Sequence, residues 1–437
     1  MNSYFSKNIS QKAIAFILLV LILVSSNLNW GSDRWKTIAK SDAKGYYAYL
    51  PAIFIYNDLN FGFFDEIEKE KYYNEHLYYD YRGYEGAIIN KYYAGTALCQ
   101  LPFFLTAHGL SHAFGYEIDG YSKLYAISIN IAALFYLFIG LIFLNKILKQ
   151  FVEKDSVRAF TLIATVFGTH LFYYTVVEGG MSHVFSFAFF SMFIYFCLQY
   201  FKHFKAKYIV ILALILGVII LIRPLNIMIV LSLPLLAGNY QALKKGAKTL
   251  TTYWKHTLLG VFLATLIVSI QFIIYKISTG SFIVYSYGEE GFNFLEPHFF
   301  DILFSYKKGL FLYTPLLFIS LFGSYSLYKK SKFQFWSWIG FFIIVTYILS
   351  SWWNWWYGGS FSSRVYIEFI PFFMILFAMV LEGVKKAWLR SIFYTLSIIL
   401  IVICQIQTFQ YRYNDIHWEE MTKEKYWDVF LRIDKLL

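Results

Sequence analysis

Residues 208–240 read YIVILALILGVIILI-RP-LNIMIVLSLPLLAGNY, two apolar runs that meet at Arg223-Pro224. We expect two short helices packed back to back across a bilayer, or one broken helix, with two helices favoured. The whole chain shares this character, because 58% of its 437 residues are hydrophobic, 22% are aromatic and only 15% are charged. A soluble domain carries about 25% charged residues. The sequence therefore predicts an all-α polytopic membrane protein and excludes soluble domains, disorder, coiled coil and collagen.

Apolar runs of spanning length recur along the chain. A spanning helix needs about 20 mainly apolar residues, and a window of that size predicts about eleven transmembrane helices. No soluble domain boundary interrupts them, so 1–437 is expected to form one membrane domain. The predicted spans are 12–29, 124–145, 157–177, 181–201, 208–222, 225–240, 256–277, 309–328, 333–351, 365–384 and 389–409.

Lysine and arginine are unevenly distributed among the loops, and they set the predicted orientation. With the N-terminus in the cytoplasm, 19 of the 38 Lys and Arg residues lie on the cytoplasmic side, with only three acidic residues, Glu153, Asp155 and Glu382. Cytoplasmic loops of membrane proteins carry such a positive excess. The net charge of +11 is therefore explained by topology and not by nucleic-acid binding. Since no retention signal is visible, we expect a bacterial inner membrane.

This orientation leaves two long segments outside. The first outer loop, 30–123, contains an apolar stretch at 87–114, and a crossing there would invert every later loop. We therefore expect 87–114 to lie along the outer interface as an amphipathic or partly inserted helix. Segment 410–437 is predicted to be a short outer C-terminal tail.

Several charged residues gather at the outer ends of the predicted spans. Charges near lipid are costly and tend to be functional, and a transporter more often places them at mid-depth. The pattern therefore indicates a site at the boundary between membrane and exterior. We expect Glu85, His183 and Tyr46 to contact substrate. The charged or ionisable residues in this set are Asp42, Glu85, Lys91, Glu178, His183, Arg223, Arg364 and Glu368.

Two acidic residues are candidates for catalysis. Asp42 follows the first span in the segment Ser41-Asp42-Ala43-Lys44, where an Asp favours a helix N-cap. A carboxylate at a helix start beside an apolar boundary is also a plausible general base. Glu178 precedes a Gly-Gly turn that ends at His183. This turn is either a satisfied polar loop or a second acidic site beside Asp42.

Three cations complete the expected site. Lys91, Arg223 and Arg364 could together bind a phosphate or pyrophosphate, although Lys and Arg at helix ends also extend to lipid headgroups. The backbone groups freed by Pro224 usually need protein partners. The Gly-Gly turn before Arg364 lets the backbone approach a ligand closely. For the pair His108 and His112, a polar interfacial face is favoured over a metal site.

The order of these elements resembles a known family. One helix enters, an outer loop begins with Ser41-Asp42, and an interfacial stretch contains Asn90-Lys91-Tyr92-Tyr93-Ala94-Gly95. Glu178 follows the third span, and Arg223-Pro224 closes a later one. This layout is similar to the GT-C superfamily of integral-membrane glycosyltransferases, especially the protein O-mannosyltransferases and the lipid A aminoarabinose transferase. The resemblance covers roughly the first 240 residues.

The resemblance implies transfer of a sugar from a polyprenyl-phosphate donor to an acceptor at the outer face. Asp42 would take the proton of the acceptor, and Lys91, Arg223 and Arg364 would stabilise the leaving phosphate. The acceptor could be a glycan, a lipid or a protein. Some relatives use a divalent metal, which Asp42 and Glu178 could share, although no metal site is assigned and no cofactor is certain.

Other functions stay open. A transporter or flippase of a lipid-linked saccharide would share the hydrophobicity and the cations, and a saccharide polymerase would also have large outer loops. Walker, GxGxxG, HExxH and GxSxG motifs are missing from the sequence, which argues against an ATP-driven pump, a metalloprotease or a serine hydrolase.

Overall fold

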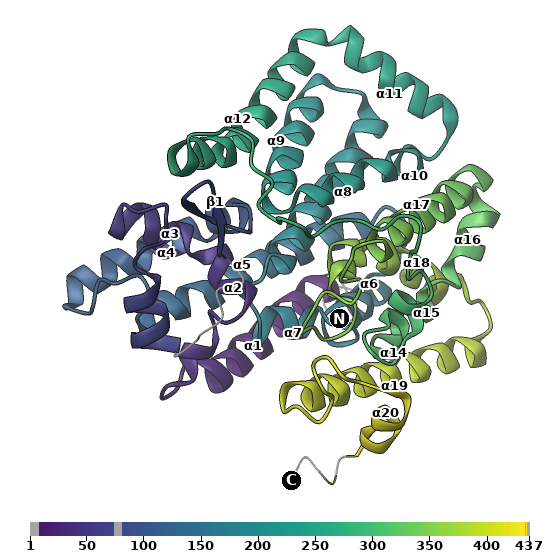
Figure 1. The fold of residues 1–437 in the computed structure, drawn as a ribbon. Coiled ribbons are helices and arrows are strands. Elements are labelled where there is room, and N and C mark those ends of the chain that lie inside the picture. Colours follow the sequence, from purple (N-terminus) through teal and green to yellow (C-terminus); the bar gives the residue numbers. More distant parts are fainter. Residues whose placement is uncertain (1–7, 74–80, 433, 435–437) are drawn as a thin grey trace.

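The computed structural model describes residues 8–73, 81–432 and 434, so short parts of the predicted first outer loop and C-terminal tail lie outside the described residues. The described chain is mostly helical (Figure 1). Here η marks 3-10 and π helices. In chain order the elements are α1 (Ile9–Asn29), η1 (Arg34–Thr37), α2 (Asp42–Tyr47), α3 (Tyr49–Pro51), η2 (Ala52–Tyr56), η3 (Phe64–Tyr73), β1 (Tyr81–Tyr84), β2 (Ala87–Asn90), α4 (Gly95–Phe114), α5 (Lys123–Leu148), α6 (Asp155–Phe167), α7 (Leu171–Val176), α8 (His183–His203), α9 (Ala206–Ile222), η4 (Pro224–Ser232), α10 (Leu233–Ala237), α11 (Tyr240–Thr252), α12 (Trp254–Thr279), α13 (Asp301–Phe304), α14 (Leu310–Tyr313), α15 (Pro315–Ser320), α16 (Gly323–Lys330), α17 (Lys332–Ser350), η5 (Arg364–Phe369), α18 (Ile370–Gly383), α19 (Ala387–Arg412) and α20 (Lys423–Val429).

Seven helical segments are long and apolar enough to cross a membrane, which marks the chain as an integral membrane protein. They are α1, α5, α8, α12, α17, η5 with α18, and α19. The remaining four predicted spans are short or interrupted. The stretch 208–222 is α9, and 225–240 contains η4 and α10. The stretch 157–177 divides into α6 and α7, and 309–328 divides into α14, α15 and α16.

Two of these interruptions occur at prolines. Pro224 begins η4 and Pro315 begins α15, where the missing N–H costs no helical hydrogen bond. Arg223 has φ −152° and ψ 116°, the extended conformation that a following proline favours. The Arg223-Pro224 junction therefore ends α9 and turns the chain before η4.

A small hairpin corrects the all-α expectation. β1 and β2 are antiparallel, with Tyr81 opposite Asn90 and Tyr84 opposite Ala87. Glu85 and Gly86 at the turn have φ of +48° and +86°, the backbone that two-residue hairpin turns favour. The interfacial helix expected over 87–114 is therefore wrong at its start, which pairs as a strand, and the helix α4 begins only at Gly95.

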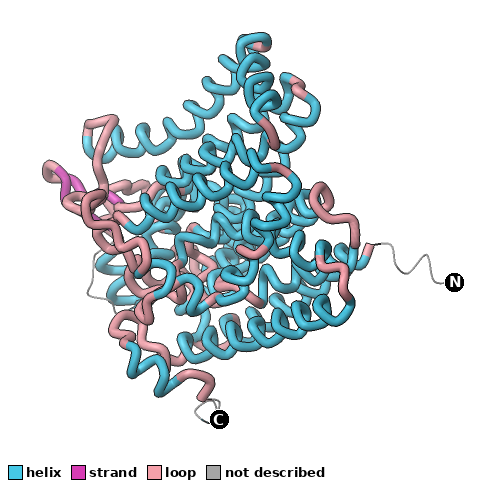
Figure 2. Tube along the Cα trace, turned by 90° about the vertical axis from the view of Figure 1, so that its right-hand side faces the viewer, coloured by secondary structure: helices cyan, strands magenta, loops and turns pink. Residues whose placement is uncertain are grey.

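The chain has two distinct faces. Ser10 donates from its hydroxyl and backbone N–H to Asp155, at 2.6 and 3.1 Å. Glu382 at the end of α18 accepts from the backbone N–H groups of Glu153 and Lys154, both at 2.9 Å. These contacts join segments that the sequence predicts to lie on the cytoplasmic side. Figure 2 shows the hairpin and most irregular loops at the opposite side, which we call the loop face.

The long helices differ in how far the protein encloses them. In the η5–α18 span 94% of the apolar window is buried, against 56% in α5 and only 17% in α12. Figure 1 shows α18 inside the bundle and α12 at its edge. Leu258, Val261 and Phe262 on α12 are each 58–62% exposed. An apolar helix with apolar exposed sides is stable where lipid replaces water.

Candidate functional site

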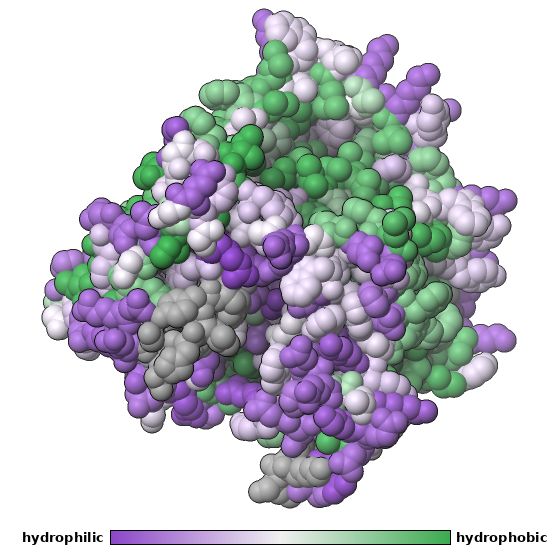
Figure 3. Space-filling view, viewed as in Figure 1, coloured by the Kyte–Doolittle hydropathy of each residue, from purple (hydrophilic) through white to green (hydrophobic). Residues whose placement is uncertain are grey.

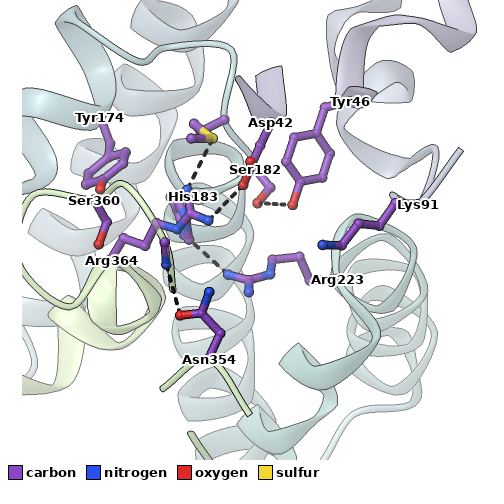
Figure 4. Close-up of polar contacts among 12 residues, drawn as sticks. Asp42, Tyr46, Lys91, Tyr174, Ser182, His183, Arg223, Asn354, Ser360 and Arg364 are labelled. Atoms are coloured by element: carbon purple, nitrogen blue, oxygen red, sulfur yellow. Dashed lines mark hydrogen bonds and ion pairs between the residues drawn. The ribbon is translucent and has the colours of Figure 1, made fainter. Parts of the chain in front are cut away.

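A cavity of about 900 Å³ collects most of the predicted site residues. Eight residues were assigned a catalytic, phosphate-binding or substrate-binding role from the sequence. Seven of them line the cavity, although they come from segments spread over more than 300 positions. Glu85 does not line it, because the hairpin turn holds its side chain exposed. Figure 4 shows Asp42, Tyr46, Lys91, His183, Arg223 and Arg364 converging on one space. The residues that line the cavity are Asp42, Tyr46, Lys91, Glu178, His183, Arg223 and Arg364.

Asp42 forms an ion pair with Arg364 at one side of the cavity. The Arg364 Nη2 donates to Asp42 Oδ2 at 2.8 Å, and the two side chains are only 13% and 15% exposed. Asp42 is the first residue of α2, and the N-cap is Ser41, which makes no side-chain cap hydrogen bond. The expected N-cap role of Asp42 was therefore wrong by one position. The Asp42 carboxylate therefore already has a cationic partner within the protein.

Arg223 pairs with the fully buried carboxylate of Glu368. Arg364 and Glu368 both belong to η5. Glu368 Oε1 accepts from Arg223 Nη1 at 3.2 Å and lies 3.0 Å from His183 Nδ1. The Glu368 side chain is 0% exposed and that of Arg223 is 19% exposed. Arg223 therefore has its charge balanced on the protein side while part of its guanidinium reaches the cavity.

Lys91 is held at the other side of the cavity by the hairpin and a distant loop. Its Nζ lies 2.7 Å from Glu290 Oε1, and Arg82 Nη2 lies 3.1 Å from the same oxygen. The Lys91 carbonyl accepts from Ser286 Oγ at 2.8 Å. Two cations thus share one carboxylate, so the Lys91 side keeps a net positive charge toward an anionic ligand.

The segments that carry Lys91 and Arg223 approach each other at Gly95. A Cβ placed on Gly95 would lie 2.2 Å from the backbone N of Ile222 and 2.3 Å from the carbonyl carbon of Leu221. Gly95 begins α4 just after Lys91, and Ile222 directly precedes Arg223. The absence of a side chain here therefore sets how closely the two cations are brought together.

We expect Gly95→Ala to destabilise the protein by about 1–3 kcal/mol, since overpacking forces the backbone apart. Thermal unfolding of the full chain in detergent measures the loss. Gly109→Ala is the matched control in the same helix, because an added Cβ meets no atom of the described residues within 4 Å. That control should be neutral or stabilising, as Ala favours a helix over Gly. Equal losses in the two variants would contradict the close contact.

Glu178 differs from the other two carboxylates that line the cavity, Asp42 and Glu290, because no arginine contacts it at hydrogen-bond distance among the described residues. Tyr173 OH donates to its Oε1 at 3.1 Å. The other oxygen, Oε2, is buried and has no hydrogen-bond partner within the described part of the chain. Burial raises the pKa of the Glu178 carboxyl to about 7, and the positive charge of Arg364 opposes the rise. Glu178 can therefore take up or release a proton near neutral pH.

Tyr46 joins the two sides of the cavity. Its OH accepts from Ser182 Oγ at 3.2 Å, and its ring lies 4.3 Å from that of Tyr92. Ser182 directly precedes His183, and Tyr92 directly follows Lys91. Tyr46 is therefore placed between the His183 and the Lys91 sides of the cavity, as a substrate-contacting residue would be.

Three residues at or beside the cavity were not given a role from the sequence. Glu368 was noticed as a charge at a span end but was given no role. Glu290 lies in an irregular loop with no local pattern to mark it. Lys308 is 2% exposed and donates from Nζ to the carbonyl of Ser360, beside the Gly-Gly turn. Its one sequence signal was Lys307-Lys308 on the predicted outer side, where positive pairs are uncommon.

The acidic residues at the cavity lack the donor set of a metal site within the part of the chain that the structure describes. No group of three or more His, Cys, Asp or Glu suited to a metal occurs among the residues that the structure describes. Asp42 and Glu178 could offer two carboxylates, but the Arg364 guanidinium already binds Asp42 Oδ2. His108 and His112 lie with ring centroids 4.8 Å apart, and His108 Nδ1 is 2.8 Å from Tyr125 OH. This donor set does not fit a divalent cation, and no step is assigned to one.

Comparison with known proteins finds no relative. No protein-family model matches the chain, and neither a curated protein nor a solved structure matches it. The resemblance to the GT-C glycosyltransferases therefore stays a prediction.

Proposed function

We propose that this chain is a membrane glycosyltransferase that moves a sugar from a polyprenyl-phosphate carrier to an acceptor hydroxyl. The observation that carries the proposal is the cavity at the loop face. Its lining includes Arg223, Arg364 and Lys91, which suit a phosphate, and two carboxylates of different character, Asp42 and Glu178. The residues Pro224, Leu225 and Ile227 line the same cavity. An apolar wall beside cations suits a substrate that is half lipid and half phosphate.

The proposal includes the membrane arrangement. We propose eleven crossings, with α9, η4–α10, α6–α7 and α14–α16 as the short or broken ones, and with the loop face outside. The N-terminus would then lie in the cytoplasm and α20 outside, in a bacterial inner membrane. Supporting this, the described α1 begins on the side opposite the hairpin, whereas α20 lies near the loop face (Figure 2).

The leaving phosphate would be stabilised by Arg223 and Lys91. Both line the cavity. Arg223 is paired with Glu368, whereas Lys91 shares Glu290 with Arg82, so only the Lys91 side keeps an excess positive charge. A polyprenyl phosphate departs as an anion, so it needs cations and not a proton donor. Fixed cations in a partly buried site stabilise such developing charge strongly.

The two carboxylates would divide the remaining work. In the reaction the acceptor oxygen forms a bond to the anomeric carbon, the bond from that carbon to the phosphate oxygen breaks, and the acceptor proton passes to a carboxylate. Asp42 was expected to be this base, but Arg364 already binds one of its carboxylate oxygens. We assign the proton to Glu178, whose Oε2 is unpartnered within the described residues. Asp42 would then face the positive charge that develops on the sugar.

A transporter would be supported by charges that continue toward the opposite face. Six of the charged or ionisable residues predicted at the span ends instead line a single cavity, namely Asp42, Lys91, Glu178, His183, Arg223 and Arg364. The second alternative, a saccharide polymerase, shares the proposed chemistry and differs in its acceptor.

Lys91→Ala should lower kcat/KM for the lipid-linked donor about 10- to 100-fold, since a hydrogen bond to a charged group contributes about 1.5–3 kcal/mol. Purified full-length protein in bilayer nanodiscs is supplied with radiolabelled polyprenyl-phosphate sugars extracted from bacterial membranes, and label transferred from the lipid phase is counted. Arg82→Ala is the matched control, because Arg82 binds the same Glu290 but does not line the cavity. Equal transfer by wild type and Lys91→Ala would reject the phosphate assignment, and no transfer from any sugar would reject the function.

A further inference from the structure

One part of the cavity is not used by the proposed transfer of the donor sugar. The end of α19 and the segment after it contribute Arg412, Asn414 and Trp418, and the loop between α17 and η5 contributes Trp353 and Asn354. Trp418 is 47% exposed and Trp353 is 51% exposed. These residues form a mouth to the cavity that we call the aromatic mouth.

The aromatic mouth differs chemically from the side at Pro224, Leu225 and Ile227. Figure 1 shows α9 and α10 in the upper half of the view and α19 in the lower half. Figure 3 shows hydrophobic surface around a hollow in the upper half, and mainly hydrophilic surface in the lower half. The cavity lining itself combines an apolar part at Pro224, Leu225 and Ile227 with the polar and aromatic residues of the aromatic mouth.

The aromatic mouth has a built geometry. A Cβ on Gly359 would lie 3.3 Å from Trp418 Cε3, so the glycine backbone supports the indole. Tyr357 and Ser362, at either end of this turn, have φ of +57° and +58°. Non-glycine residues adopt this left-handed conformation at a cost, and such strain gathers at ligand sites. The turn therefore holds Trp418 at the cavity.

A hydrogen-bond donor is also left without a partner. The Nη1 of Arg412 is buried and has no hydrogen-bond acceptor among the residues that the structure describes. Asn354 Oδ1 accepts from the Gly358 N–H at 3.2 Å. The amide NH₂ of Asn354 takes no part in this hydrogen bond. Arg412 and Asn354 both line the cavity, and each side chain carries N–H groups that can donate to a polar ligand.

The cavity is large enough for two sugar units. Its volume of about 900 Å³ lies near the upper end of the roughly 300–1,000 Å³ that small-molecule sites occupy. One sugar on a phosphate beside Arg223 and Lys91 fills only a part of that space. The aromatic mouth is then available to an acceptor whose hydroxyl reaches the anomeric carbon.

We propose that the acceptor is a carbohydrate, and that Trp353 and Trp418 bind its sugar faces while Arg412 and Asn354 bind its hydroxyls. This inference rests on the proposed function and names the acceptor class of the same site. Exposed indole rings offer flat apolar faces to the C–H groups of a sugar ring, and neutral amides match hydroxyls that donate and accept. A lipid acceptor would instead need an apolar approach on this side. A peptide acceptor would need an unpaired strand edge or a groove for an extended backbone.

The test is direct binding of soluble glycans by the full chain in nanodiscs. The probes are immobilised trisaccharides to hexasaccharides of neutral hexoses, N-acetylhexosamines and uronic acids, together with a Ser/Thr-rich peptide. We expect at least one glycan class to bind and the peptide not to bind. Trp418→Ala and Trp353→Ala should each weaken glycan binding about threefold to tenfold, the range that aromatic contacts contribute.

Trp427→Ala is the control. Trp427 belongs to the same C-terminal segment and is 55% exposed, but it does not line the cavity, so glycan binding should be unchanged. Binding of the peptide alone, no binding of any glycan, or equal losses in all three tryptophan variants would overturn the inference. Glycan binding without transfer from any lipid-linked donor would instead count against the proposed function. Transfer to water or a simple alcohol without glycan binding would count against the acceptor class alone.

Discussion

Glu178→Gln should lower the transfer rate about 100- to 10,000-fold, the range that a positioned general base contributes. The wild-type rate should fall about tenfold for each pH unit below about 7, because protonated Glu178 cannot accept the proton of the acceptor. The Gln variant cannot ionise, so its residual rate should be flat through this range. Initial rates of label transfer in nanodiscs between pH 5 and 8.5 measure both effects.

Asp42→Asn is the informative comparison for that experiment. It removes the partner of Arg364, so the rate should fall, but the decline below pH 7 should persist because Glu178 is intact. If instead Asp42→Asn removes the pH dependence and Glu178→Gln keeps it, the proton belongs to Asp42, as the sequence alone suggested.

Stability gives a second measurement of Glu178 that does not depend on activity. Its pKa in the folded protein is raised from 4.5 to about 7, so the folded state binds the proton more tightly than the unfolded state. The stabilisation is fully present below pH 4.5 and is lost as the pH rises to about 7. The wild type should therefore lose more thermal stability than Glu178→Gln between pH 5 and 8.

Part of this site was predictable because lipid makes charge expensive. Arg223 and Arg364 stand out at the ends of apolar runs, where each charge needs a reason to be retained, and Asp42 stands out early in the outer loop that follows the first span. Glu290 did not stand out, because a carboxylate in an irregular loop is equally compatible with solvent. Its role depends on contact with Lys91, 199 positions away along the chain, and no local pattern records such a contact.

The fold was predictable to the same extent and for the same reason. Long apolar runs identify the seven long helices, and Pro224 and Pro315 explain two interruptions. The break between α6 and α7 has no proline. A Cβ on Gly168 would lie 2.6 Å from Leu316 and 3.0 Å from Ile401, so tertiary packing from distant segments acts at this position. The hairpin was missed because its strands are short, while the apolar run that contains β2 continues into α4.

Arg223→Met should destabilise the protein by about 3–5 kcal/mol, the usual cost of removing one partner of a buried ion pair. Glu368 is 0% exposed, and its Oε2 has no hydrogen-bond partner in the described chain, so the loss of Arg223 leaves a buried negative charge beside His183. Thermal unfolding in detergent measures the loss. Arg432→Met removes an exposed arginine paired with Asp434 and should leave stability unchanged.

The double variant Arg223→Met with Glu368→Leu separates the structural role of Arg223 from its proposed role at the phosphate. Replacing both charged partners with apolar side chains removes the stranded charge, so most of the stability should return. The transfer rate should stay about 100- to 1,000-fold below wild type, since no apolar side chain can stabilise the departing phosphate. If the double variant recovers transfer together with stability, Arg223 acts only through Glu368, and the phosphate must be bound by Lys91 and Arg364.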